Sequence, residues 1–218
     1  MFVKICGITN EEDALLSIAM GADALGFIFA PSSRQVSVAT VAGIVPRLPP
    51  EIVTFGVFRD ELPVRVISAV QEAGLKGAQL HGQESAEDTA LVTASVRHVI
   101  KAFAATSVGL GHASSYAVDA FLLDSADPGS GRVFDWRLAE ALPRTRRLIL
   151  SGGLHPGNVA EAINLVHPWG VDVSSGVESA PGLKDPTKVR EFVAAVRAVE
   201  PEEYSSDLDS PYDWQEEP

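Results

Sequence analysis

The sequence predicts a single (β/α)8 barrel with eight parallel strands, an α/β fold. Short apolar runs alternate with segments of helical spacing along most of the chain, and several of the runs are apolar at nearly every position, as in strands covered on both faces. No linker rich in glycine, proline and serine divides the 218 residues, a length that commonly forms one α/β barrel.

The strand-like runs set the order of the expected elements. Along the chain they are residues 2–6, 22–29, 52–58, 77–81, 98–104, 119–124, 147–151 and 170–174. The weakest connection is residues 106–118, because its glycines would shorten any helix. An open doubly wound sheet is the alternative, but such sheets usually have about five or six strands, so two runs would have to be misassigned.

The segments between the runs have apolar side chains at helical spacing. In residues 186–199 and 157–168 these side chains fall at i, i+3, i+4 and i+7, and so share one helix face. Asn10 is expected to be a helix N-cap, and Gly21 and Gly74 suit helix ends.

The charge of the chain excludes some classes of partner. Seventeen basic and 29 acidic side chains give a net charge of −12, which makes nucleic acid and anionic membrane surfaces poor partners. Residues 200–218 contain eight carboxylate side chains and no lysine or arginine. We therefore expect a catalytic barrel domain over residues 1–199, followed by an acidic, disordered tail over residues 200–218.

The single cysteine and the hydropathy of the chain indicate in which cellular compartment the protein is expected. One cysteine cannot form an internal disulfide, which fits a reducing environment. The first residues lack the basic region and long apolar region of a signal peptide, and no apolar stretch reaches the ~18 residues that span a bilayer. We expect a cytoplasmic protein without a membrane partner.

Polar and reactive residues end several of the apolar runs. Cys6, His81, Asp124, Ser151 and Ser174 end the first, fourth, sixth, seventh and eighth runs. In a (β/α)8 barrel the C-terminal ends of the strands and the loops after them form the active site. Buried cysteine often serves only as a small hydrophobic residue, so Cys6 alone decides nothing.

Two glycine-rich turns follow the last two runs. SGGLHPGNV (151–159) has Pro156 where a helix is expected to open, and VDVSSGVE (171–178) lies at the next strand. Glycine lets backbone N–H groups approach an anion, and phosphate sites at these two loops recur in the fold. The chain is therefore expected to bind a phosphorylated small molecule.

Other polar groups near the expected barrel mouth are less specific. Arg34, after the second run, could bind a carboxylate in bidentate fashion. The glycine-bearing stretch 127–131 after Asp124 suits a loop that folds over a ligand. No group of histidine, cysteine and acidic residues has metal-ligand spacing, so we expect no metal.

Together these segments resemble the phosphoribosylanthranilate isomerase family over residues 2–198. The resemblance rests on KICGIT (4–9), GADALGFIF with SSRQVS (21–37), FGVF (55–58), QLHG (79–82), LLDS with FDW (122–136), SGGL (151–154) and VDVSSGVE with PGLKD (171–185). Each motif is weak alone, but their shared order at the expected strand ends is specific.

The resemblance implies an aldose–ketose isomerase of L-tryptophan biosynthesis. Its members convert N-(5-phosphoribosyl)anthranilate into 1-(2-carboxyphenylamino)-1-deoxyribulose 5-phosphate, an Amadori rearrangement that needs no cofactor. Carried over motif by motif, Cys6 is the general base and Asp124 the general acid. Both steps are proton transfers, for which positioned acids and bases typically supply ~10²–10⁴-fold.

The resemblance also assigns the binding residues. Arg34 would contact the anthranilate carboxylate, and His81 would line the site. The phosphate would be held by backbone groups of Gly152, Gly153, Ser175 and Gly176. The expected partner is a small phosphosugar, and the chain is expected to be a monomer or a homodimer.

Lys4 suggests how Cys6 could ionise. Strand alternation sends Lys4 to the same side as Cys6. Our hypothesis is that Lys4 and the phosphate-loop donors favour the thiolate, because nearby cations lower a thiol's pKa.

The motifs depart from the usual family pattern at two places. GSGRVFDW replaces a run usually closer to GGTGKTFDW, and His155 stands where an asparagine N-cap is common.

Two other functions remain open at this point. One is a different phosphosugar barrel enzyme, such as an indole-glycerol-phosphate synthase, the histidine-pathway isomerase or a dual-substrate isomerase. The first of these would rely on lysine acids, for which Lys4 and Lys101 are available. The other is a non-catalytic sensor of a phosphorylated metabolite, which would have no need of Cys6 and Asp124.

Overall fold

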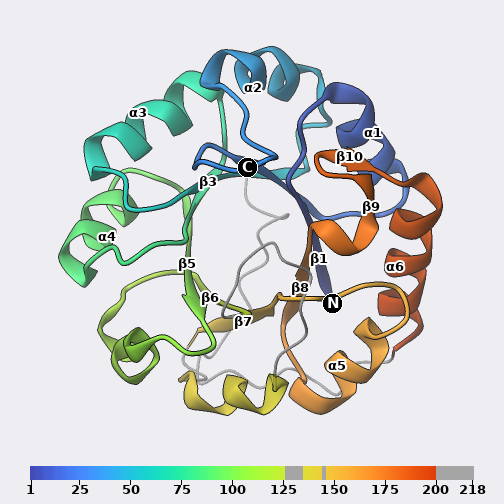
Figure 1. The fold of residues 1–218 in the computed structure, drawn as a ribbon. Coiled ribbons are helices and arrows are strands. Elements are labelled where there is room, and N and C mark those ends of the chain that lie inside the picture. Colours follow the sequence, from blue (N-terminus) through green and yellow to red (C-terminus); the bar gives the residue numbers. More distant parts are fainter. Residues whose placement is uncertain (126–134, 144–145, 200–218) are drawn as a thin grey trace.

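The chain folds into a closed barrel of strands surrounded by helices (Figure 1). The computed structural model describes residues 1–125, 135–143 and 146–199. The expected acidic tail, residues 200–218, and the expected ligand loop, residues 127–131, lie outside the described residues. No helix in the described part of the chain is long and apolar enough to cross a membrane.

Eight parallel strands form the barrel, and each pairs with its neighbours in the sequence. They are β1 (Phe2–Cys6), β2 (Ala24–Ile28), β3 (Val53–Phe58), β4 (Gly77–Leu80), β5 (His98–Ala104), β6 (Ala120–Asp124), β7 (Arg147–Leu150) and β8 (Gly170–Val173). Because β1 also pairs with β8, the sheet is closed and the (β/α)8 prediction is confirmed. The open doubly wound sheet is wrong.

Helices follow most of the strands. The α-helices are α1 (Glu11–Ala19), α2 (Val38–Ile44), α3 (Pro63–Ala73), α4 (Ala86–Thr93), α5 (Val159–Val166) and α6 (Pro186–Ala198). The 3₁₀ helices are η1 (Val45–Arg47), η2 (Val108–Ser115), η3 (Trp136–Ala141) and η4 (Ser175–Val177). A small antiparallel pair, β9 (Glu178–Ala180) and β10 (Leu183–Lys184), lies between β8 and α6. As expected for its glycines, the connection after β5 forms the 3₁₀ helix η2 rather than an α-helix.

Local signals set the helix ends, with one correction. The Asn10 side chain accepts a hydrogen bond from the Asp13 N–H at 2.8 Å, and Gly74 ends α3 in the left-handed region at φ +68°, both as predicted. Pro156, however, does not open α5, which starts at Val159. The Asn158 side chain instead accepts from the His155 N–H at 2.8 Å, so a turn comes before the helix.

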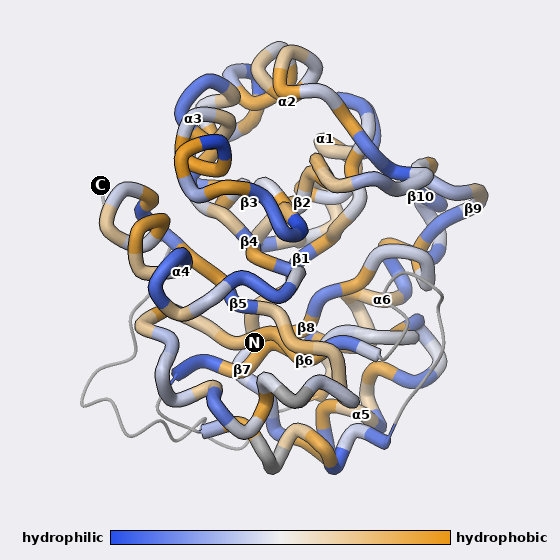
Figure 2. The backbone as a smooth tube through the Cα atoms, turned by 60° about the vertical axis from the view of Figure 1, so that its left-hand side comes forward, coloured by the Kyte–Doolittle hydropathy of each residue, from blue (hydrophilic) through white to orange (hydrophobic). Residues whose placement is uncertain are grey.

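The interior of the barrel differs from one end to the other. Its N-terminal part is filled by an apolar cluster, the inner cluster, made of Phe2, Ala24, Val53, Phe55, Ile100, Ala102, Ala120, Leu122 and Ile149. A second, larger cluster packs the strands against the helices. In Figure 2 hydrophobic colouring follows much of the strand ring, whereas the most hydrophilic stretches lie in loops and along parts of the helices.

The first and last strands of the barrel meet where β1 pairs with β8, the β1–β8 seam. The Lys184 N–H donates to Asp13 Oδ2 at 2.9 Å, and Lys184 Nζ donates to the Cys6 carbonyl at 2.7 Å. The Thr9 hydroxyl donates to the Gly182 carbonyl at 2.6 Å. These bonds fasten the segment after β8 over the end of β1, and so fix the backbone that carries Cys6.

Candidate active site

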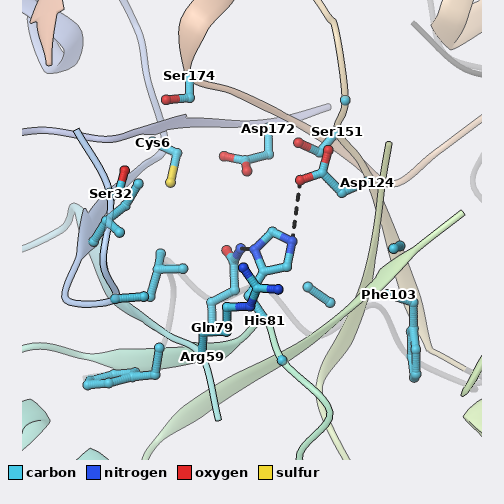
Figure 3. Close-up of a pocket in the computed structure, with 18 of the residues that line it drawn as sticks. Cys6, Ser32, Arg59, Gln79, His81, Phe103, Asp124, Ser151, Asp172 and Ser174 are labelled. Atoms are coloured by element: carbon cyan, nitrogen blue, oxygen red, sulfur yellow. Dashed lines mark hydrogen bonds and ion pairs between the residues drawn. The ribbon is translucent and has the colours of Figure 1, made fainter. Parts of the chain in front are cut away.

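A cavity of about 810 Å³ opens at the C-terminal ends of the strands. Seven of the eight site residues predicted from the sequence line this cavity: Cys6, Arg34, His81, Asp124, Gly152, Gly153 and Ser175. The eighth, Gly176, does not line it. Figure 3 shows Cys6 and Asp124 on opposite sides of this cavity, with Asp172 between them. A cavity of this size suits a small-molecule ligand.

The glycine-rich loops after β7 and β8 form one wall. Gly152 and Gly153 have φ of +84° and +68°, the left-handed region that favours glycine. In the described part of the chain, their amides have no protein acceptor. Two N–H groups at the cavity wall are therefore available to an anion.

Gly176 lies behind this wall and joins the two loops. A Cβ added at Gly176 would lie 1.9 Å from the Leu154 carbonyl oxygen, which no side chain tolerates. The loops after β7 and β8 therefore pack backbone to backbone. Gly176 is required for that packing, and among the described residues it is not part of the cavity lining.

Cys6 ends β1 in a buried, highly charged environment. Lys4, on the same side of the strand, makes an ion pair of 2.9 Å with Asp172, and both are buried. Burial raises the pKa of the Cys6 thiol above its usual value, and Asp172 adds to this, while Lys4 and Lys184 act in the opposite direction. Lys4 therefore favours the thiolate, as we expected, but burial outweighs it in the ligand-free site.

Lys4 keeps its own charge in this environment. Burial alone would lower the pKa of Lys4, but the Asp172 carboxylate and Cys6 raise it above its usual value. The ammonium beside the thiol is thus permanently charged near neutral pH. It is available to stabilise a thiolate once that forms.

Asp124 ends β6 and faces His81 across the cavity. His81 Nε2 lies 3.3 Å from Asp124 Oδ2, and Asp124 Oδ1 accepts from the Ser125 N–H at 2.7 Å. On the other side of the imidazole, Gln79 Nε2 lies 3.1 Å from His81 Nδ1. Asp124 is thus a buried carboxyl group with one oxygen held by the Ser125 backbone N–H and the other directed toward His81.

Arg34 lies after β2 and is held by Glu178. Arg34 Nε and Nη2 donate to Glu178 Oε1 and Oε2, each at 2.8 Å, a bidentate pair that is largely buried. Lys184 Nζ also donates to Glu178, at 3.0 Å. Burial opposes ionisation of Glu178, but Arg34 and Lys184 hold its pKa below the usual value. Arg34 therefore reaches the cavity in a fixed orientation.

Sequence reasoning missed Glu178, Lys184, Asp172 and Gln79 as site residues. Each was inside a quoted motif, VDVSSGVE, PGLKD or QLHG, and each is a polar residue that the fold buries. A buried charge has to be paired, so the acidic residues of VDVSSGVE were the available signal.

The sequence and the fold match known proteins over nearly the whole chain. Residues 3–195 match the family described as N-(5'phosphoribosyl)anthranilate (PRA) isomerase. An N-(5'-phosphoribosyl)anthranilate isomerase of Desulforudis audaxviator is 48% identical over 202 residues, covering 89% of this chain and 97% of the relative.

Comparison with solved structures leads to the same family. The phosphoribosyl anthranilate isomerase of Thermus thermophilus superposes with a TM-score of 0.86 at 41% identity, covering 92% of this chain and 100% of that one. A phosphoribosyl anthranilate isomerase solved in complex with reduced 1-(o-carboxyphenylamino)-1-deoxyribulose 5-phosphate superposes with a TM-score of 0.79 at 37% identity, covering 90% and 98%. This chain belongs to the N-(5'-phosphoribosyl)anthranilate isomerase family.

Proposed function

We propose that the chain converts N-(5-phosphoribosyl)anthranilate into 1-(2-carboxyphenylamino)-1-deoxyribulose 5-phosphate with Cys6 as general base and Asp124 as general acid. The observation that carries these roles is that the two side chains face one cavity from opposite sides, beside a wall with two available amides (Figure 3). A sugar held by its phosphate at that wall would lie between an acid and a base.

The two residues act in succession. Asp124 gives its proton to the furanose ring oxygen as the C1–O bond breaks, which leaves a Schiff base between C1 and the anthranilate nitrogen. The Cys6 thiolate then removes the proton from C2, and the electron pair neutralises the iminium to give an enaminol. Protonation at C1 and loss of the C2 hydroxyl proton complete the ketone.

The remaining roles concern binding. Arg34, oriented by Glu178, binds the anthranilate carboxylate through the guanidinium N–H groups that Glu178 does not occupy. Gly152, Gly153 and Ser175 line the wall that takes the phosphate, and Gly176 holds the two loops together. The absence of a cofactor and of a metal, a cytoplasmic location and a monomer or homodimer remain predictions.

The function is tested by following anthranilate fluorescence as freshly prepared phosphoribosylanthranilate is consumed. The parent is expected to turn over, and Cys6→Ala and Asp124→Ala are each expected to be slower by about 100-fold or more. An inactive parent that converts another phosphosugar would identify a different barrel enzyme. An inactive parent that only binds would identify a sensor. An active parent with unaffected variants would contradict the roles of Cys6 and Asp124.

A further inference from the structure

Gln79 has a buried side-chain amide that, among the described residues, is hydrogen-bonded to His81 alone. It lies on β4 with 1% of its surface exposed. Its Nε2 lies 3.1 Å from His81 Nδ1, and in the described part of the chain its Oε1 has no partner. Burying an amide is unfavourable unless it is hydrogen-bonded, and an apolar side chain would fill this place at lower cost. The presence of an amide at this buried place is therefore explained by its contact with His81 and not by the packing of the barrel.

The two neighbours of His81 favour the same tautomer of its imidazole. The Gln79 amide N–H donates to Nδ1, which then holds a lone pair, so the ring proton is on Nε2. Nε2 faces Asp124 Oδ2 at 3.3 Å, and once Asp124 has given its proton away its carboxylate oxygen requires a donor there. In the opposite tautomer, lone pairs of Nε2 and Oδ2 would face each other.

We propose that Gln79 is a positioning residue that fixes His81 as the Nε2–H tautomer, and that this N–H stabilises the Asp124 carboxylate formed when Asp124 gives its proton away. The proposal rests on the acid role proposed for Asp124. The proton of Asp124 goes to the ring oxygen of the substrate, and His81 keeps its own proton throughout. Gln79 acts only through His81.

The geometry makes this a contribution to the reaction rather than to substrate binding. The 3.3 Å separation is slightly longer than the ~2.7–3.2 Å of a formed N–H···O bond, so in the resting structure the contact is incomplete. It strengthens as negative charge develops on Asp124. An interaction that is stronger in the transition state than in the ground state raises kcat and leaves KM nearly unchanged.

The tautomer is measured directly by ¹⁵N NMR of the imidazole in the ligand-free protein, with His81→Asn used to assign the signals. The parent is expected to have a protonated Nε2 and an unprotonated Nδ1. In Gln79→Glu the side chain only accepts, so Nδ1 is expected to become protonated. A parent with a protonated Nδ1, or a Gln79→Glu variant whose Nδ1 stays unprotonated, would overturn the proposal. Because no turnover is needed, this result is independent of the proposed function.

The kinetic arm uses Gln79→Met, which keeps the size but cannot donate. Its kcat is expected to fall about 10- to 100-fold, the range for one hydrogen bond to a charged group, with KM within about twofold. Gln71→Met makes the same change on the exposed face of α3, away from the cavity, and is expected to match the parent. A Gln79→Met variant that keeps its kcat, or that changes KM alone, would overturn the proposal.

Discussion

The two ends of the barrel interior are built on opposite principles. At the N-terminal end the inner cluster is apolar throughout. At the C-terminal end the strands and the segments that follow them contain buried charged side chains, among them Lys4, Asp172, Arg34 and Glu178. Apolar burial stabilises a fold, whereas a buried ion pair contributes little net stability and is kept for what it positions. The difference teaches that stability and chemistry occupy separate layers of this barrel, and that substitutions in one layer should leave the other intact.

The largest expected effect is on stability, from the apolar end. Phe55 is completely buried in the inner cluster, so Phe55→Ala should lower the free energy of unfolding by about 3–5 kcal/mol. The measurement is urea denaturation, with Cys6→Ala as the comparison at the other end, expected to cost about 1 kcal/mol. Equal losses for the two variants would contradict the separation into layers.

The next largest effect is expected on substrate affinity, from a substitution among the buried charged side chains at the C-terminal end of the barrel. Glu178→Gln keeps the shape but weakens the bidentate hold on Arg34, so KM should rise about tenfold while kcat changes less. Steady-state kinetics check this, and Glu161→Gln, an exposed carboxylate on α5, is the matched control. A fall in kcat alone would show that Glu178 does not act by orienting Arg34.

The pH dependence of activity is expected to separate the effects of Lys4 and Asp172 on Cys6 at the C-terminal end of the barrel. The pKa of Cys6 is raised by burial, and the role proposed for Cys6 requires the thiolate, so activity should still be rising with pH above about 8.5, the value of a free thiol. Lys4→Met removes a charge that lowers this pKa and should move the rise to higher pH. Asp172→Asn removes a negative charge that raises the pKa of Cys6, and should move the rise in activity to lower pH.

The same titration has a consequence for stability. Because the folded protein holds the thiol proton more tightly than the unfolded chain, this contribution to stability is complete below about pH 8.5. It is lost as the pH rises from there through the folded pKa. Thiolate absorbance near 240 nm follows Cys6, the only cysteine in the chain, once the titration of the three tyrosines is subtracted with the Cys6→Ala variant. If the thiol titration of Lys4→Met and that of Asp172→Asn shifted in the same direction, the opposed roles of Lys4 and Asp172 would be contradicted.

The smallest expected effect concerns the acidic tail. Removal of residues 200–218 should leave kcat and KM within about twofold and the unfolding midpoint unchanged, because the family match ends at residue 195. Kinetics and thermal unfolding of the truncated chain check this. A loss of turnover would give the tail a role in the active site.

The sequence was a good guide to the strands, because each strand is largely buried along its length and several of the runs are nearly continuous in apolar residues. Every predicted run contains the observed strand, and four of the runs, 2–6, 52–58, 98–104 and 119–124, end at the same residue as the strand. Parallel strands bring their C-terminal ends to one edge, so Cys6, His81 and Asp124 could be expected to converge.

Partners within the site could not be predicted in this way. The Lys4–Asp172 pair joins residues 168 apart, and the Arg34–Glu178 pair joins residues 144 apart. No local pattern specifies which buried cation meets which carboxylate, because that choice depends on strand register around the closed barrel. The start of α5 was also missed, since Pro156 suits a turn as well as a first helical residue.

The β1–β8 seam has a consequence for how the active enzyme is made. Cys6 leaves the ribosome more than 160 residues before Asp172 and Lys184, yet these two side chains are part of its surroundings. During synthesis the thiol therefore remains outside its final environment until the eighth strand docks beside the first. Contacts of such long sequence separation form late in folding. The surroundings of Cys6 are completed only with barrel closure, so a ribosome-bound chain that lacks its last unit has all of β1 without two of the charged neighbours of its thiol.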